Sequence, residues 1–189
     1  MNFLIVEQAP DSTPHLNPLY RGISRLGPLH CYALPPDTEI NQLGRWYMDE
    51  DLKGYLHNLE KSRRFIELLH QFDPKQKYEL IEVVDGIDKP NVGNVFLGFD
   101  VVAEGNSLIQ WGLKSFVSSL DVPEPIRDLA GLIDFTFAPH LNAQGLFQEF
   151  EVASYCLQSM VAIQSLHANF YEGCDLGRFR VVDVYLVEP

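Results

Sequence analysis

The chain has 189 residues, of which 46% are apolar and 21% are charged, a composition that excludes an intrinsically disordered protein. The formal net charge is −12, and residues 77–189 carry 16 of the 26 acidic side chains but only 6 of the 14 basic ones. Because a phosphate backbone would be repelled by this charge, the composition also argues against a nucleic-acid partner.

The acidic charge is least compensated toward the C-terminus. Between Arg127 and Arg178, fifty consecutive residues include six carboxylates and no Lys or Arg. An uncompensated acidic surface repels itself and attracts cationic partners. The stretch therefore indicates a basic binding partner, and ordinary solubility is the alternative interpretation.

The length and the cysteine content limit the number of domains and the kinds of cysteine site that can be expected. The chain is long enough for one hydrophobic core, so a single domain is expected over residues 1–189. Its three cysteines, Cys31, Cys156 and Cys174, are odd in number and lack CxxC spacing. They predict neither a disulfide framework nor a zinc site, and a reducing cytoplasm is the expected location.

Two segments must be compared with export and membrane signals. The N-terminal residues contain no basic group and reach Glu7 too early for a signal peptide. Residues 152–171 carry no formal charge, but seven of them are Ser, Gln, His or Asn, which is too polar for a lipid-embedded helix. No membrane association is therefore expected.

The N-terminal part is predicted to begin with a short strand at Phe3–Val6. Six prolines follow between Pro10 and Pro36, and proline opposes long regular elements. Residues 10–48 are therefore expected to form a proline-rich irregular arm, either wrapped on the domain or functional as a loop.

A helix is predicted from Asp51 to Phe72, because apolar residues recur there at helical spacing. Asp49 or Asp51 could serve as its N-cap. The outer face of this helix carries the basic cluster of the chain, which is expected to be solvated: Lys61, Arg63 and Arg64.

Residues 78–120 predict a β-hairpin followed by a helix. Tyr78–Val84 and Asn94–Ala103 have strand composition, and the segment between them is rich in turn-forming residues. Gly98 lies inside the second strand, where glycine marks a bulge or a close helix crossing. Ser107 and Gln110 form a capping box for a helix that reaches about Leu120.

The C-terminal part predicts a long helix from Gln148 to Asn169 and a last strand from Phe179 to Val187. Polar residues repeat every seven positions in that helix, so it is expected to be a largely buried rod at the centre of the fold. Together the elements predict an α+β protein: one domain with a mixed, mainly antiparallel sheet and helices packed on one face.

No motif in the sequence names a reaction. The Asp85–Asn91 segment does not have the alternating acids of a calcium loop, and the glycines are too widely spaced for a phosphate cradle. Cys156 and His167 would lie about 16 Å apart along one helix, too far for a nucleophile and its base. The sequence therefore predicts no catalytic residue, no cofactor and no metal site.

The leading functional prediction is a docking face for a cationic protein, with complementary charge guiding association. Trp111 is predicted to be the aromatic anchor of this face. The acidic residues expected to form it are Asp85, Asp88, Asp100, Glu104, Asp121, Glu124 and Asp128.

Residues 79–113 carry a resemblance to a known class of proteins. The run Leu97–Val101, a short turn and then Ser107–Leu113 are similar to small bacterial immunity proteins of polymorphic and contact-dependent toxin systems. The resemblance implies a cytoplasmic inhibitor that binds and blocks a cognate toxin domain, often a basic nuclease.

Two other functional interpretations remain open. One is an enzyme or small-ligand-binding domain with a pocket around Asp134, His140 and Trp111, in which His140 is the best isolated catalytic candidate. The other is a subunit of a homo-oligomer that uses the apolar residues 126–147 as its interface.

Overall fold

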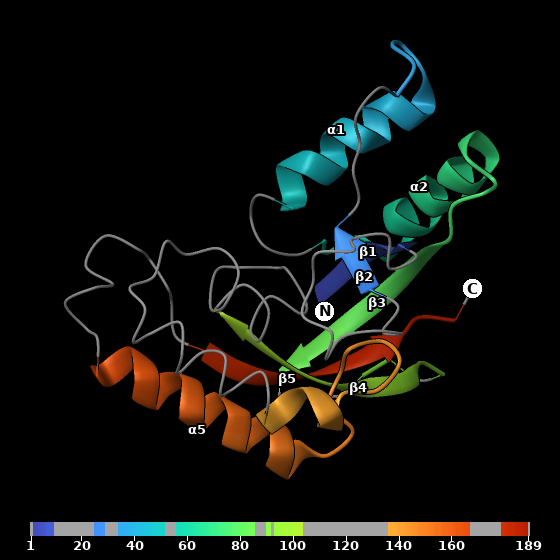
Figure 1. Cartoon of the computed structure of the whole chain (residues 1–189). Helices are drawn as coiled ribbons and strands as arrows, with labels where there is room; N and C mark the ends of the chain where they lie inside the picture. Colours follow the sequence, from blue (N-terminus) through green and yellow to red (C-terminus); the bar gives the residue numbers. More distant parts are fainter. Residues whose placement is uncertain are drawn as a thin grey trace.

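The computed structural model of the chain describes residues 2–9, 25–28, 34–51, 56–85, 90–91, 93–103, 136–166 and 179–188. Within these residues, five strands form one antiparallel sheet in the order β2-β1-β3-β5-β4 (Figure 1). The strands are β1 (Asn2–Ala9), β2 (Arg25–Pro28), β3 (Tyr78–Asp85), β4 (Val95–Ala103) and β5 (Phe179–Leu186). The helices are α1 (Glu39–Asp51), α2 (Leu59–Phe72), the 3-10 helix η2 (Ala138–His140) and α5 (Phe150–Leu166).

This architecture confirms the predicted α+β class and the antiparallel sheet, but the helices occupy both faces of it. Figure 1 shows α1 and α2 on one side of the sheet and α5, which contacts β4 and β5, on the other. The reason is visible in β1, where Phe3 and Ile5 enter one core while Leu4 and Val6 enter the other. Successive strand residues point to opposite faces, so an uninterrupted apolar run requires cover on both.

The two faces bury separate clusters. The first core joins β1, β3 and the end of β5 to helices α1 and α2, and its largest fully buried side chains include Tyr47, Phe3 and Phe65. The second core lies under the opposite face and includes Leu146, which precedes α5 in the chain.

The predicted hairpin of β3 and β4 is wrong, because β5 lies between the two strands. Val83 of β3 pairs with Val184 of β5, and Val184 pairs with Gly98 of β4, in both cases antiparallel. β3 and β4 therefore run in the same direction and cannot be joined by a tight turn. Turn-forming residues predict where a strand ends, but they do not determine which other strand it pairs with.

The predicted helix Asp51–Phe72 is also wrong in its first part. Leu56 is not helical: it exchanges two backbone hydrogen bonds of 2.9 Å with Phe3 of β1. The helix that follows, α2, begins after Asn58, whose side chain accepts a hydrogen bond from the backbone N–H of Lys61. Asn58 is thus the N-cap, instead of Asp49 or Asp51.

The segment 10–48 is less irregular than its prolines predict, since it includes β2 and most of α1. α1 begins after Thr38, whose hydroxyl oxygen accepts a hydrogen bond from the N–H of Asn41 and donates one to the carbonyl of Pro35. The prolines therefore end before the helix starts, and a local cap lets it form.

Gly98 confirms the predicted bulge. The register of β4 against β5 shifts between Phe96 and Gly98, and Gly98 has a φ of +152°. A Cβ at this position would lie 2.7 Å from the carbonyl oxygen of Phe147. Glycine is therefore required by both the backbone conformation and the close approach of a second chain segment.

α5 confirms the predicted C-terminal helix but not its burial. Ala153 and Cys156 are fully buried, whereas Phe150 is 51% exposed and Tyr155 is 62% exposed. Within the described residues α5 thus covers an outer part of the sheet instead of forming a central rod. No helix in the described part of the chain is long and apolar enough to cross a membrane.

Candidate functional site

Six of the eight residues predicted to form the docking face lie outside the described residues: Asp88, Glu104, Trp111, Asp121, Glu124 and Asp128. The other two, Asp85 and Asp100, are described and lie in different strands, β3 and β4. Both point to the second-core face, since each stands opposite Val182 of β5 in its own strand pair.

Asp85 is half-exposed at the end of β3, and it has a partner within the chain. Its Oδ2 atom lies 2.7 Å from Nη1 of Arg180 in β5. The guanidinium neutralises this carboxylate locally, so Asp85 can contribute to a docking face only together with Arg180.

Asp100 is only 4% exposed, and its Oδ1 atom accepts a hydrogen bond of 2.8 Å from the N–H of Val101. A carboxylate in this position cannot reach a partner protein unless β4 moves. Asp100 therefore has a structural role in the fold, in contrast to the predicted docking role.

A second buried carboxylate, Glu82, was not singled out by the sequence and is 1% exposed. It accepts three hydrogen bonds: from the N–H of Asn91 at 2.9 Å, from the amide of Asn91 at 2.8 Å and from the amide of Asn94 at 2.6 Å. Both asparagines belong to the connection between β3 and β4. Glu82 therefore anchors Asn91 and Asn94, which lie between β3 and β4 in the chain, to the face of the sheet that carries the first core.

An aromatic row extends from the centre of the sheet to α5 across its outer strand. It consists of Tyr185, Phe96, Phe99 and Phe150, and we use this name for these four residues. Successive ring centroids lie 5.3, 5.0 and 5.6 Å apart in edge-to-face arrangement. Phe96 is 43% exposed and Phe150 is 51% exposed, so two members offer ring surface to solvent.

The aromatic row has one acidic neighbour in β5, Asp183. Asp183 stands opposite Phe99 and Tyr185 opposite Phe96, and the Tyr185 hydroxyl donates to Oδ2 of Asp183 at 3.5 Å. Burial raises the pKa of Asp183 above its ordinary value. The pKa of Tyr185 is raised too, first by burial and then by the negative charges of Asp183 and Glu82. The row thus combines apolar rings with groups that favour a nearby cation.

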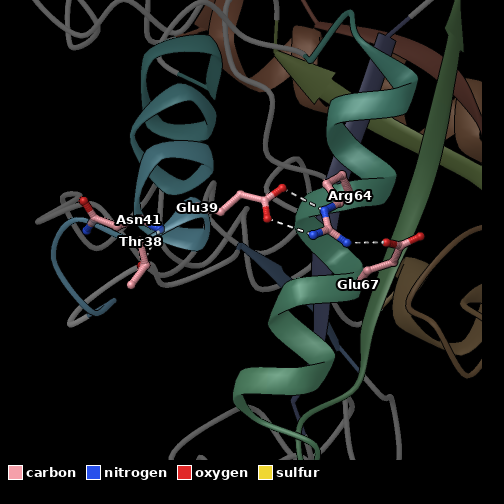
Figure 2. Close-up of polar contacts among 5 residues, drawn as sticks. All are labelled: Thr38, Glu39, Asn41, Arg64 and Glu67. Carbon is pink, nitrogen blue, oxygen red and sulfur yellow. Dashed lines mark hydrogen bonds and ion pairs between the residues drawn. The ribbon is translucent and has the colours of Figure 1, made fainter.

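The basic cluster of α2 is exposed, as predicted, and its cations also make contacts within the chain. Arg64 of α2 donates two hydrogen bonds of 2.8 Å to Glu39 of α1 and one of 3.1 Å to Glu67 (Figure 2). Lys61 lies 5.5 Å from the ring centroid of Trp46 in α1. Lys61 and Arg64 therefore join α2 to α1, whereas Arg63 donates to the backbone carbonyl of Glu188 at 2.8 Å.

Among the residues of the alternative pocket, His140 alone is described, and its side chain is exposed at the end of η2. Asp134 and Trp111 lie outside the described residues. Within the described ranges, no group of three or more His, Cys, Asp or Glu side chains could hold a metal ion.

The apolar segment 126–147, predicted as an interface between subunits, is described from residue 136 onward. In that part Phe137, Leu146 and Phe147 are buried within the chain itself. The rings of Phe137 and Phe147 pack edge-to-face at 6.4 Å. These apolar side chains thus serve the fold, and residues 126–135 lie outside the described part.

Comparison with protein-family models, with curated proteins and with solved structures gave no match for this chain.

Proposed function

We propose that this protein is an acidic protein-binding domain whose partner is a cationic protein, and that the aromatic row is the centre of its contact surface. The observation that carries the proposal is the combination of exposed phenylalanine rings with a net charge of −12. Aromatic side chains are enriched at the energetic centres of protein interfaces, while complementary charge speeds association and selects the partner.

The packing of the row supports a contact function. Edge-to-face neighbours restrict the rotation of Phe96 and Phe99, so little side-chain entropy would be lost on binding. A Lys or Arg side chain of the partner could lie over an exposed ring, which attracts cations through its negative face. Asp183 beside the row would add to that attraction.

The specific form that we propose is an immunity-type inhibitor, which neutralises a cognate basic toxin domain by covering its active site. This form is supported by the acidic balance of the chain and by the resemblance of residues 79–113 to immunity proteins. Such an inhibitor acts by binding alone, so the proposal assigns no catalytic residue and no cofactor to this chain.

Co-expression tests the proposal directly. A toxin domain encoded beside this gene would be expressed in a bacterial host with and without this protein, and growth would be measured. The unaltered protein should restore growth, and the purified pair should associate more slowly at high salt, because screening weakens long-range attraction. No protection and no complex at low salt would contradict the proposal.

A matched pair of variants locates the contact surface. Phe150→Ala in the row should weaken the complex about tenfold, as expected for an interface aromatic, which corresponds to about 1.4 kcal/mol. Phe72→Ala is the control, since Phe72 is also 51% exposed but lies at the end of α2. Equal effects of the two substitutions would remove the row from the contact surface.

A further inference from the structure

The outward side of α5 is exposed and carries no charge along most of its length. α5 covers β4 and β5 with one side and turns the other away from the sheet (Figure 1). No Lys, Arg, Asp, Glu or His occurs between Val152 and Leu166. The solvent side of a surface helix normally carries charged residues, so an uncharged one in a chain of net charge −12 is typical of a contact surface.

The exposed residues of α5 form one line along the helix, which we call the α5 stripe. Its members follow one another at alternating intervals of four and three residues: Glu151, Tyr155, Gln158, Ala162 and Ser165. This spacing keeps residues on one side of a helix, and it is the pattern by which two helices pack along their length. Ala153 and Cys156, which are fully buried, lie on the opposite side.

Apolar surface is concentrated in the middle of the α5 stripe. Tyr155 is 62% exposed, and Val161, which lies beside Ala162 at the edge of the stripe, is 43% exposed. The ring of Tyr155 lies 5.9 Å from that of Phe137, a buried residue, so the chain itself supports one side of the ring. Little side-chain freedom would therefore be lost if another molecule packed against Tyr155.

The α5 stripe is complementary to itself when a second copy lies against it in the antiparallel direction. Gln158 is the middle residue, so a twofold axis beside it places two Gln158 amides opposite each other, and an amide both donates and accepts hydrogen bonds. On each side of the axis, the large ring of Tyr155 then faces the small side chain of Ala162 in the second copy. Glu151 and Ser165 lie at the two ends, where water reaches the carboxylate.

Charge also favours a second copy as the partner of this surface. Two chains of net charge −12 repel each other, so they pack most easily where neither presents a carboxylate. The part of the stripe between Val152 and Leu166 meets that condition. A cationic protein would gain no charge complementarity from this uncharged face, and the aromatic row with Asp183 beside it suits such a partner better.

We propose that two copies of this chain form an antiparallel dimer through their α5 stripes. α5 has 17 residues and is therefore about 25 Å long. A contact of this length between two helices buries less than the roughly 800 Å² per partner of a standard interface, so the dimer is weak, with a Kd on the order of 100 µM. The stripe contains no residue of the aromatic row, and the dimer does not depend on the proposed function.

Sedimentation velocity tests the proposal, with protein concentrations from about tenfold below to about fivefold above that Kd. The average sedimentation coefficient should rise from that of a monomer toward that of a dimer. Raising NaCl from about 0.1 M to about 0.5 M should tighten the dimer about threefold, because salt screens the repulsion between two acidic chains. A monomer at every concentration and at both salt levels would overturn the proposal.

The salt dependence keeps this proposal separate from the proposed function. A complex with a cationic protein should weaken as salt is added, whereas the dimer should tighten. A chain that stays monomeric could still bind a cationic partner, and a chain that dimerises need not bind one. The two proposals can therefore fail independently.

A matched pair of isosteric substitutions tests the position of the twofold axis. Gln158→Glu places two carboxylates opposite each other and should weaken the dimer at least about tenfold at pH 7. Gln42→Glu adds the same charge at an exposed position of α1 and is the control, with an expected change of less than about twofold. Equal losses would show that association follows the net charge alone, and the assignment to α5 would be wrong.

Removal of the Tyr155 ring gives an independent check. Tyr155→Ala should weaken the dimer about tenfold, whereas Met48→Ala, at an exposed apolar position of α1, should leave it unchanged. If Tyr155→Ala left sedimentation unchanged but weakened the binding of a cationic partner, the stripe would belong to that contact, and the dimer would be overturned. If this variant does not fold, the comparison of Gln158→Glu with Gln42→Glu decides alone.

Discussion

Glu39 of α1 and Arg64 of α2 form a bidentate ion pair across the interface between the two helices, with both hydrogen bonds at 2.8 Å (Figure 2). The hydrogen bond from Arg64 lowers the pKa of Glu39, and the pKa of Arg64 is raised in turn. The pair joins two helices that are 25 residues apart in the chain at this point. It also gives Arg64 a structural role in joining α1 to α2.

The pH dependence of this ion pair has a defined sign. A lowered pKa means that Glu39 stabilises the fold when ionised, fully above its ordinary pKa of 4.5 and progressively less as the pH falls below it. Glu39→Gln should therefore lower the Tm at pH 7 by at most about 3 °C, because the pair is exposed. The difference from the unaltered protein should shrink below pH 4.5 in thermal unfolding curves; a difference that grew there would contradict this assignment.

Asp183 should show the opposite behaviour. Burial raises its pKa, so its ionised form is disfavoured in the folded state, and its contribution to stability is lost as the pH rises from 3.8 through the raised pKa. Asp183→Asn should therefore stabilise the protein at pH 7, by less than about 1 kcal/mol because solvent screens this partly buried group. Urea unfolding at pH 3.5 and pH 7 measures the effect. A loss of stability at pH 7 would contradict this and show that the hydrogen bond from Tyr185 outweighs the cost of burying the carboxylate.

Glu82 should be among the most sensitive polar positions in the described chain. Glu82→Ala removes the acceptor of three hydrogen bonds and leaves the donors of Asn91 and Asn94 without it, at a cost of about 3 kcal/mol. Glu60→Ala on the exposed face of α2 is the control and should cost less than about 0.5 kcal/mol. Chemical denaturation measures both. A small effect at Glu82 would mean that the crossing connection is held by other contacts.

Substitutions at two glycines with positive φ, Gly93 and Gly98, distinguish the cost of backbone strain from the cost of a steric clash. Gly98→Ala places a Cβ 2.7 Å from the carbonyl oxygen of Phe147, whereas at Gly93, with a φ of +99°, nothing lies within 4 Å of that Cβ. Gly93→Ala should cost about 1 kcal/mol through strain alone, and Gly98→Ala about 3 kcal/mol or more. Comparable losses in the free energy of unfolding would show that the approach of Phe147 adds nothing to the requirement for glycine.

Local residue patterns predicted most of the regular elements correctly. β3, β4, β5 and α5 have nearly the bounds expected from their apolar periodicity, and the bulge at Gly98 was indicated by a glycine inside a strand. The sequence did not predict that the helix is interrupted at Leu56. Leu56 is an apolar residue at helical spacing, and nothing in the local sequence indicates that its backbone will form hydrogen bonds with Phe3 of β1. At such a position the local helix propensity is outweighed by hydrogen bonds to a distant part of the chain.

The candidate site was harder to predict than the fold. The negative charge is evident from composition, but the burial of Asp100 and Glu82 depends on which strands become neighbours. Phe96 and Phe150 are 54 positions apart in the sequence, and only the folded sheet places them in one row with Phe99.

The amino-acid sequence by itself determined the charge, the α+β class and most strand and helix positions, because these depend on composition and on contacts a few residues apart. The tertiary structure decided the strand order, the presence of helices on both faces, and which carboxylates are buried. The physical reason is that strand pairing joins residues of high sequence separation, so β5 could enter between β3 and β4 without leaving a local signal in either strand.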